Sequence, residues 1–440
     1  MLHGGEIYDK KIDIDFSVSI NPLPCPETVK EALKEALSET DKYPDIFQKS
    51  FKEAVCRAEN AFGNPLSPYN IIGGNGASEL LAGIVRMINP REALIAAPSF
   101  YGYEHALNMA DSCNIRRVGI PLLAPPAIYG RCDEKPKSDG AAFILTEDFA
   151  DNITDGTDLV IIGNPNNPTG KCIDNKTLIS IIERCRNKGC ALIVDECFFR
   201  LSDYGITGEL SDTSASEGGT RSDISAPDNG TCVISARAYI DKYPDLYVID
   251  AYTKLFSIPG VRVGFCISSP DNISRLQKYL PEWNMSVFAQ KAGAACARVL
   301  SGEPAPDSET ISGVTETPSD AKEKKPGVFL RDTIQMIKRE RLYLTEKLTS
   351  SGFTVYDSDC NFVLFEAPDD LGSRLMERGI LIREWDDRFK DYWCPDREKN
   401  LKISDNNRLY RIAVINHSQN EALIRAVSEI SELSLFDRLR

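Results

Sequence analysis

The sequence predicts an α/β fold, in which a large domain with a mostly parallel sheet is followed by a smaller α+β C-terminal domain. Two observations support this fold class. In the middle of the chain, short apolar runs such as 159–162 and 191–194 alternate with segments of helical periodicity, which is typical of a parallel sheet covered on both faces. From about residue 330, a long helical stretch precedes the short strand-like runs 353–355, 362–365 and 410–414.

With 440 residues the chain is long enough for two domains. We expect residues 43–300 to form the large domain, 328–440 to form the small domain, and 1–42 to pack with the small domain. Two polar segments lack apolar periodicity, and we interpret 205–243 as a peripheral insertion and 301–327 as a polar linker.

Composition excludes several classes of partner. The formal net charge is −14 and no basic tract occurs, which argues against nucleic acid and against an anionic membrane face. No apolar run approaches the ~20 residues of a membrane span. With only three histidines, none beside a cysteine pair, a zinc site is not expected. The thirteen cysteines form no C-x-x-C pair, which indicates reduced thiols and a cytoplasmic location.

Lys254 is the first candidate for chemistry. It follows the apolar run 247–249 and lies eight residues before Arg262. A lysine amine can form a Schiff base with a phosphate-bearing aldehyde, and a cation one loop away can bind the phosphate. Asp195 directly follows the run 191–194, where a carboxylate needs a partner such as a protonated pyridine nitrogen.

Two loops complete the pattern. The glycines of 73–76 precede apolar residues at helical spacing, so they predict a helix N-terminus whose free N–H groups bind anions. The turn-rich loop 163–170 contains the sequence Asn-Pro-Asn-Asn-Pro. Singly, these features also occur in plain turns, loops and helix caps. In this order, with Asp195, Lys254 and Arg262, they resemble the fold-type I pyridoxal-phosphate enzymes of the class I/II aminotransferase superfamily.

The resemblance implies pyridoxal 5'-phosphate as the cofactor and assigns its contacts. Lys254 would form the Schiff base, Asp195 would pair with the ring nitrogen, and Asn167 would donate to the ring hydroxyl. The residues that would surround the cofactor phosphate are Gly76, Ala77, Ser78, Thr253 and Arg262.

Two aromatic residues are assigned in the same way. Phe100 matches the aromatic side chain that stacks on the cofactor ring. Tyr43 matches a tyrosine that reaches the phosphate from the neighbouring subunit, which implies a homodimer.

Four residues are candidates for binding substrate. Arg411 matches the arginine that binds the substrate α-carboxylate, for which a planar fork of donors is suited. Arg383 is similar to a second arginine near the substrate, or it is a surface cation that ends a strand. Asn21 belongs to an opening, 15–23, that is similar to the threonine-phosphate decarboxylase branch. His3 would contact a substrate phosphate, or it belongs to a disordered terminus.

The reaction is predicted from departures within the superfamily. Ala251 stands where many relatives have a hydroxyl for the cofactor phosphate. Phe198 stands where the histidinol-phosphate aminotransferase branch has a tyrosine, and the start His3-Gly4-Gly5 is similar to the opening of the decarboxylase branch. We therefore expect a decarboxylase of an O-phosphorylated α-amino acid, a small anionic substrate. The alternative is an aminotransferase acting on histidinol phosphate or another amino-phosphate. A regulator without turnover would need an appended DNA-binding domain, for which the acidic N-terminal segment leaves no room.

Overall fold

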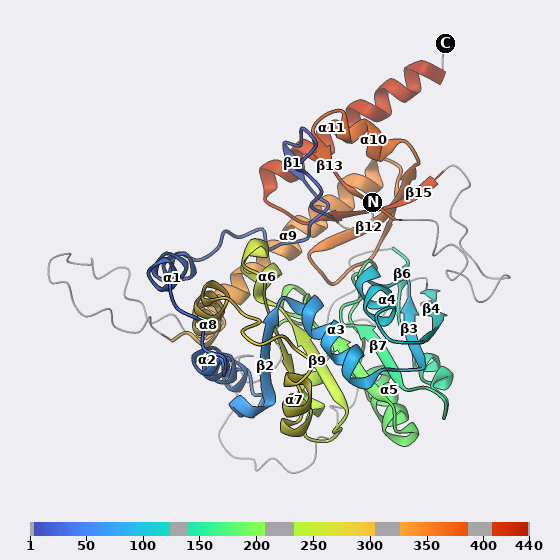
Figure 1. Cartoon of the computed structure of the whole chain (residues 1–440). Helices are drawn as coiled ribbons and strands as arrows, with labels where there is room; N and C mark the ends of the chain where they lie inside the picture. The colour runs from blue at the N-terminus through green and yellow to red at the C-terminus, as the bar shows by residue number, and fades with distance from the viewer. Residues whose placement is uncertain (1–3, 124–139, 207–232, 304–325, 386–406, 439–440) are drawn as a thin grey trace, which may run out of the picture.

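The computed structural model describes residues 4–123, 140–206, 233–303, 326–385 and 407–438. Figure 1 shows two parts, with the C-terminal part placed above the end of the larger one. In the described ranges, no helix has both the length and the hydropathy that crossing a membrane requires.

The large part is built on a seven-stranded sheet with the order β2-β10-β9-β8-β7-β3-β4. Its strands are β2 (Ile71–Asn75), β3 (Glu92–Ala97), β4 (Asn114–Gly119), β7 (Leu159–Gly163), β8 (Ala191–Asp195), β9 (Leu246–Asp250) and β10 (Val263–Ile267). Only β10 runs antiparallel to its neighbours, so the predicted mostly parallel sheet is confirmed. A separate short pair, β5 (Leu122–Leu123) and β6 (Ala142–Phe143), is antiparallel.

Helices cover both faces of this sheet (Figure 1). One face packs against α2 (Lys49–Ala61), α5 (Asn175–Lys188) and α8 (Val287–Ser301), and the other against α3 (Ala77–Ile88), α4 (Tyr101–Leu107) and α7 (Pro270–Gln277). The strands are apolar on both sides, because Leu192 and Val194 of β8 face the first core while Ile193 faces the second.

The C-terminal part has a four-stranded antiparallel sheet with the order β11-β12-β15-β14. Its elements are β11 (Thr354–Tyr356), β12 (Phe362–Pro368), β14 (Arg383–Glu384), β15 (Asn407–Ala413), α9 (Val328–Ser350), α10 (Leu371–Met376) and α11 (His417–Arg438). The long helix α9 joins the two cores, since Leu330 and Ile337 pack in the core of the large part and Leu344 and Leu348 in that of the C-terminal part.

The N-terminal segment 1–42, expected to pack with the C-terminal domain, contacts both parts. Strand β1 (Ile14–Asp15) pairs in parallel with β13 (Ile380–Leu381) of the C-terminal part. Helix α1 (Glu27–Ala36) lies instead against α8 of the large part. Most of the expected linker 301–327 lies outside the described residues.

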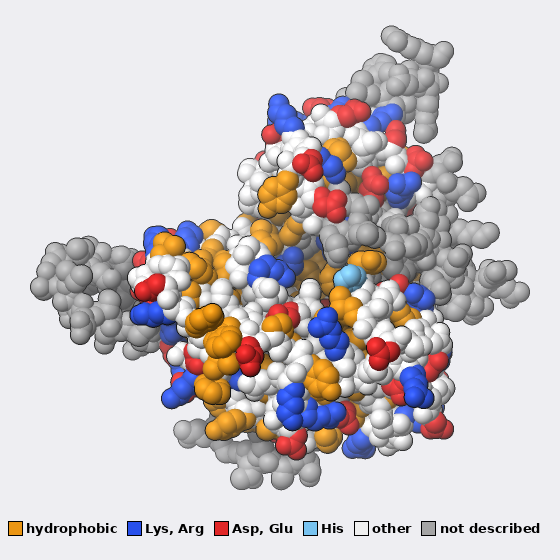
Figure 2. Space-filling view, viewed as in Figure 1, with side chains coloured by type: hydrophobic (Ala, Val, Ile, Leu, Met, Phe, Trp, Pro, Cys, Tyr) orange, Lys and Arg blue, Asp and Glu red, His pale blue; other side chains and the backbone are white. Residues whose placement is uncertain are grey.

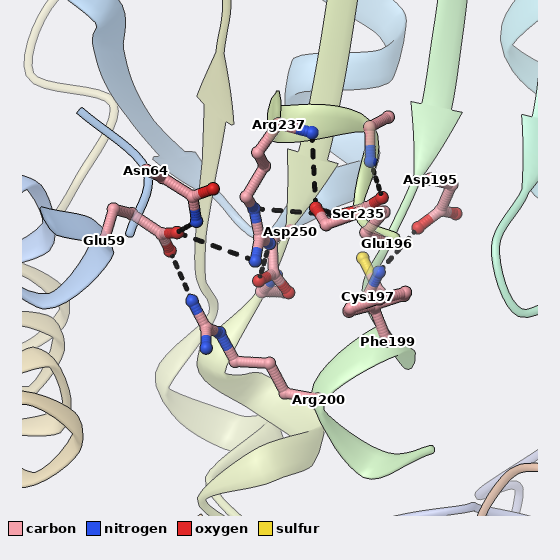
Figure 3. Close-up of polar contacts among 12 residues, drawn as sticks. Glu59, Asn64, Asp195, Glu196, Cys197, Phe199, Arg200, Ser235, Arg237 and Asp250 are labelled. Atoms are coloured by element: carbon pink, nitrogen blue, oxygen red, sulfur yellow. Dashed lines mark hydrogen bonds and ion pairs between the residues drawn. The ribbon is translucent and has the colours of Figure 1, made fainter. Parts of the chain in front are cut away.

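A cluster of five buried charged side chains lies behind the carboxyl ends of β8 and β9 (Figure 3). Arg237 is its centre, and its guanidinium pairs with Asp250, lies 3.6 Å from Glu196 Oε2 and lies 3.7 Å from Glu59 Oε2. Arg200 Nη2 donates to Glu59 Oε1 at 2.8 Å. These contacts join α2 to the two strands whose ends carry the candidate catalytic residues.

The cluster corrects one sequence prediction. Residues 205–243 were expected to be peripheral, but Ser235, Ala236 and Arg237 are all buried, and Ser235 Oγ donates to Glu196 Oε2 at 2.5 Å. The prediction is therefore wrong for the C-terminal end of that segment, while 207–232 lies outside the described residues. Composition misled here because a polar segment can still be buried when its charges are paired inside the fold.

Arg237→Gln tests the cluster. Burial raises the pKa of Glu196 and of Asp250, against the pull of Arg237. Removing that guanidinium leaves buried carboxylates without their main partner, so we expect a loss of about 3–5 kcal/mol in the free energy of unfolding, measured with urea. Arg339→Gln is the matched control, because that side chain is 70% exposed and should change the unfolding midpoint little. Equal effects of the two substitutions would contradict the assignment.

Candidate functional site

A cavity of about 220 Å³ opens at the carboxyl ends of the parallel strands, below the C-terminal part. Figure 2 shows the surface hollowed between the two parts. This edge of a parallel sheet is where α/β proteins bind ligands. The sequence-predicted residues that line the cavity are Ala77, Ser78, Phe100, Asn167, Asp195, Thr253, Lys254, Arg262, Arg383 and Arg411.

One wall of the cavity is suited to an anion. Helix α3 begins after Gly76, whose φ of +78° favours glycine, and presents the main chain of Ala77 and Ser78 to the cavity. A Cβ added to Gly76 would lie 2.4 Å from Arg262 Nη2, so the guanidinium packs directly on this helix start. Backbone N–H groups and a cation therefore converge, which fits a phosphate.

Asp195 ends β8 with both carboxylate oxygens bonded. Oδ1 accepts from the backbone N–H of Cys197 at 3.0 Å, and Oδ2 accepts from the phenol of Tyr103 at 3.0 Å. The donors come from the turn after β8 and from α4 on the neighbouring face. A carboxylate held from two elements suits a fixed pairing with a ring nitrogen.

Lys254 lies on the short helix α6 (Tyr252–Leu255), which follows β9 directly. Burial, together with the positive charge of Arg411, lowers the pKa of its amine to about 8. The amine is therefore closer to its neutral, nucleophilic form at neutral pH than an exposed lysine. The main-chain carbonyl oxygen of Lys254 accepts from the backbone N–H of Asn21 at 2.9 Å, and this bond fixes the turn that carries Lys254.

Arg411 reaches the cavity from the central strand β15 of the C-terminal sheet. Its Nη1 donates to Asn167 Oδ1 at 2.5 Å and its Nη2 to the carbonyl of Ser17 at 2.9 Å. Its Nε, although buried, makes no hydrogen bond within the described ranges. Because an unpaired buried donor is costly, this atom indicates a missing acceptor such as an anionic ligand.

Arg383 lies opposite Arg411 in the register of β14 with β15. It is 6% exposed and its guanidinium stacks over Trp385 at 5.3 Å, so the alternative of a surface cation is wrong. Burial lowers the pKa of Arg383 to about 10. Two arginines on adjacent strands thus face one cavity.

Asn21 lies outside the cavity. Its Nδ2 donates to the carbonyl of Leu255 at 2.7 Å and to Thr333 Oγ1 at 2.9 Å, while its Oδ1 accepts from the N–H of Leu23 at 2.9 Å. These bonds join the N-terminal segment to α6 and α9 instead of reaching substrate. The expected substrate contact of Asn21 is therefore corrected to a structural one.

Two other predictions concern Tyr43 and His3. Tyr43 is 81% exposed, its ring contacts that of Trp283 at a tilt with centroids 4.9 Å apart, and it does not line the cavity of its own chain. His3 lies outside the described residues, and its contact with a phosphate stays a prediction. Gly4, next to it, does line the cavity.

Phe100, Phe198 and Thr253 also line the cavity. Phe100 lines the cavity and meets Tyr103 edge to face, with centroids 5.6 Å apart. Phe198 meets Phe362 of the C-terminal part in the same way, at 5.2 Å. The hydroxyl of Thr253 donates to the carbonyl of Val263 at 3.1 Å, so its side chain also braces the neighbouring strand.

The sequence did not identify Tyr103 or Ser19 as site residues. Ser19 lines the cavity, is 1% exposed, and its Oγ has no hydrogen-bond partner in the described part of the chain. Tyr103 sits in a helix, where its position relative to Asp195 depends on packing across the sheet. No short motif marks either residue. No group of metal-binding side chains was found among the described residues.

Comparison with known proteins places the chain in a family. The model for "Aminotransferase class I and II" matches residues 11–387. A threonine-phosphate decarboxylase from Salmonella typhimurium is 26% identical over 424 residues, covering 95% of this chain and 91% of the relative. A histidinol-phosphate aminotransferase from Thermococcus kodakarensis is also 26% identical over 424 residues, covering 94% and 91%.

A solved structure supports the fold. The histidinol-phosphate aminotransferase from Sinorhizobium meliloti, in complex with pyridoxal-5'-phosphate, matches with a TM-score of 0.67 at 17% identity, covering 96% of this chain and 92% of that one. Members of the family use this cofactor, so the cofactor prediction is confirmed at that level. The family match spans most of the sequence and both parts of the fold, and the chain therefore belongs to the class I and II aminotransferase family.

Proposed function

We propose that the chain is a pyridoxal-phosphate-dependent decarboxylase of an O-phosphorylated α-amino acid. The observation that carries the proposal is the number of cations around one cavity: Arg262 lies at the helix start suited to the cofactor phosphate, and Arg383 and Arg411 line the same cavity. Two further arginines match a substrate with two anionic groups, a carboxylate and a phosphate.

When bound, pyridoxal phosphate supplies an electron sink for a bond broken at the substrate α-carbon. Asp195 would hold a proton on the ring nitrogen, and Arg411 would orient the α-carboxylate. In decarboxylation the bond to the carboxyl carbon breaks, carbon dioxide leaves, and the protonated amine of Lys254 delivers a proton to the α-carbon. Phe198 and Phe100 would exclude water from that step.

An aminotransferase acting on histidinol phosphate is the second candidate. Lys254 would then remove a proton from the α-carbon instead of delivering one. Histidinol phosphate carries no carboxylate, so in its half-reaction one of the two arginines would lack an anionic partner; that arginine would bind the carboxylate of the keto acid that accepts the amino group in the other half-reaction. The N-terminal residues that line the cavity favour the decarboxylase, since Ser17 and Ser19 belong to the opening 15–23 and Gly4 to the start 3–5, both of which resemble that branch.

Measuring the products tests whether the enzyme breaks the bond from the α-carbon to the carboxyl carbon or the bond from the α-carbon to hydrogen. The holoenzyme is incubated with O-phosphothreonine, O-phosphoserine and histidinol phosphate, and carbon dioxide and carbonyl products are measured separately. We expect carbon dioxide from a phosphorylated α-amino acid, with the amino group retained in the product. A keto acid or aldehyde formed without carbon dioxide would instead establish the aminotransferase.

The covalent link to the cofactor is tested on the lysine. Borohydride should fix pyridoxal phosphate on Lys254, identified by peptide mapping. Because the pKa of the Lys254 amine is lowered to about 8, the neutral amine increases as the pH rises through that value. The labelling rate of the apoenzyme should therefore rise between about pH 7 and 9 and level off above it, well below the range of an ordinary lysine. Lys291→Ala is the control, and persistent labelling in Lys254→Ala would contradict the assignment.

We also propose a homodimer with shared active sites. Tyr43, Phe47 and Trp283 are 81%, 70% and 43% exposed, and Figure 2 shows hydrophobic side chains gathered on the side of the large part where α2 and β2 lie. Large apolar side chains left on a surface favour a protein partner. A second copy covering this face would place Tyr43 near the neighbouring cavity, as the family resemblance implies.

Hybrid dimers test the shared site. Lys254→Ala and Tyr43→Ala subunits are each expected to have little activity. After mixing and reassociation, a hybrid contains one site with both native residues, so activity should recover to roughly a quarter of wild type at equal mixing. Mixing Lys254→Ala with itself is the control. A fully active monomer in sedimentation would exclude the proposal.

A cytoplasmic location completes the proposal. Ten cysteines in the described ranges are free thiols, and most of them are buried. Free thiols in this number suit a reducing compartment.

A further inference from the structure

We propose that Tyr103 is a positioning residue, whose phenol holds the Asp195 carboxylate in the orientation in which it pairs with the cofactor ring nitrogen. The inference rests on the proposed use of pyridoxal phosphate, but not on whether the enzyme decarboxylates or transaminates. Tyr103 belongs to α4, three residues after Phe100, which directly precedes the helix.

The first argument is the geometry of the carboxylate. The backbone N–H of Cys197 bonds Oδ1 at 3.0 Å, which fixes one oxygen but leaves the group free to turn about that contact. The phenol of Tyr103 bonds Oδ2 at 3.0 Å from a different element. With both oxygens held, the plane of the Asp195 carboxylate is set before any ligand binds.

The second argument is the space made for the phenol. In the register of β7 with β8, Gly163 is the direct neighbour of Asp195. A Cβ on Gly163 would lie 3.0 Å from Tyr103 Oη, closer than ordinary contact. The strand therefore lacks a side chain at the place that the phenol occupies, and a larger residue would push the phenol away from the carboxylate.

The third argument concerns the proton. Tyr103 is 1% exposed, and burial together with the nearby charge of Asp195 raises the pKa of its phenol well above the ordinary value. The hydroxyl therefore stays protonated and can only donate to the carboxylate in this contact. Its ring is braced by Phe100, which lines the cavity and meets it at an interplanar angle of 85°. One aromatic contact thus connects the cavity wall to the residue that bonds Asp195.

The test compares Tyr103→Phe with Tyr247→Phe in the holoenzyme. Tyr247 is also a 1% exposed tyrosine in the same core cluster, but it does not line the cavity. For Tyr103→Phe we expect the Kd of pyridoxal phosphate to rise and kcat to fall, each by on the order of tenfold, the scale of one hydrogen bond to a charged group. The KM of the amino substrate should change less than about twofold, because Tyr103 acts through Asp195.

A spectroscopic readout separates positioning from simple packing. The pH midpoint of the visible absorbance of the bound cofactor reports the charge beside its ring nitrogen. It should shift by about half a unit or more in Tyr103→Phe and stay at the wild-type value in Tyr247→Phe. Should Tyr103→Phe fold poorly, Gly163→Ala, which displaces the phenol while retaining it, should give the same shift.

The outcomes are distinct. An unchanged midpoint and unchanged Kd in Tyr103→Phe would overturn the inference while leaving cofactor binding by the wild type intact. Failure of the wild-type protein to bind pyridoxal phosphate would overturn the proposed function itself. A midpoint shift of the same size in Tyr247→Phe would reduce Tyr103 to a packing residue.

Discussion

The site depends on one constraint: a charged group at the carboxyl end of a buried parallel strand needs a partner of opposite charge, either within the protein or in a bound ligand. Asp195 at the end of β8 and Asp250 at the end of β9 point into different surroundings. Asp250 is paired with Arg237 in the closed cluster behind the strands. Asp195 is held by Tyr103 and Cys197, which are neutral donors, and its negative charge stays available to a ligand in the cavity. The fold thus supplies a cationic partner for the Asp250 carboxylate and leaves the Asp195 carboxylate for a cationic partner in the cavity.

The same division holds for the cations. The guanidinium of Arg237 is surrounded by carboxylates, whereas Arg411 has a carbonyl and an amide as partners and keeps a buried Nε without an acceptor. Arg383 lies beside it, so two positive charges remain close together with no described carboxylate bonded to Arg411. Such an arrangement is costly in the ligand-free protein and becomes favourable when an anion enters. Under the proposed function, part of the affinity for an anionic substrate would come from these two arginines on β14 and β15.

Sequence reasoning predicted the parts of the site that depend on local order along the chain. The glycines before α3, the loop containing Asn167, and the strand ends at Asp195 and Lys254 are each readable from a short window, because a strand or helix boundary determines where the side chain projects. It failed where a residue's role depends on distant partners. The sequence pattern predicted that Asn21 contacts the substrate, yet its side-chain amide donates to the carbonyl of Leu255 and to the hydroxyl of Thr333. Arg237 lies in a segment that was expected to be peripheral, yet its partners Asp250, Glu196 and Glu59 are 13, 41 and 178 residues away in the sequence. Neither composition nor periodicity indicates such pairings.

Asn167 of the large part accepts a hydrogen bond from Arg411 of the C-terminal part, so the packing of the two parts affects the residues that line the cavity. Lys171, four residues further along the same loop, pairs with Asp357 at 2.9 Å and Asp359 at 2.6 Å, both in the C-terminal part. Arg411 approaches the loop from the other side and bonds Asn167. Because these charged contacts are largely shielded from water, the loop and the C-terminal sheet are held as one unit. The position of Arg411 relative to the strand ends is thus determined in part by interactions outside the cavity, which is how the C-terminal part contributes to the candidate site.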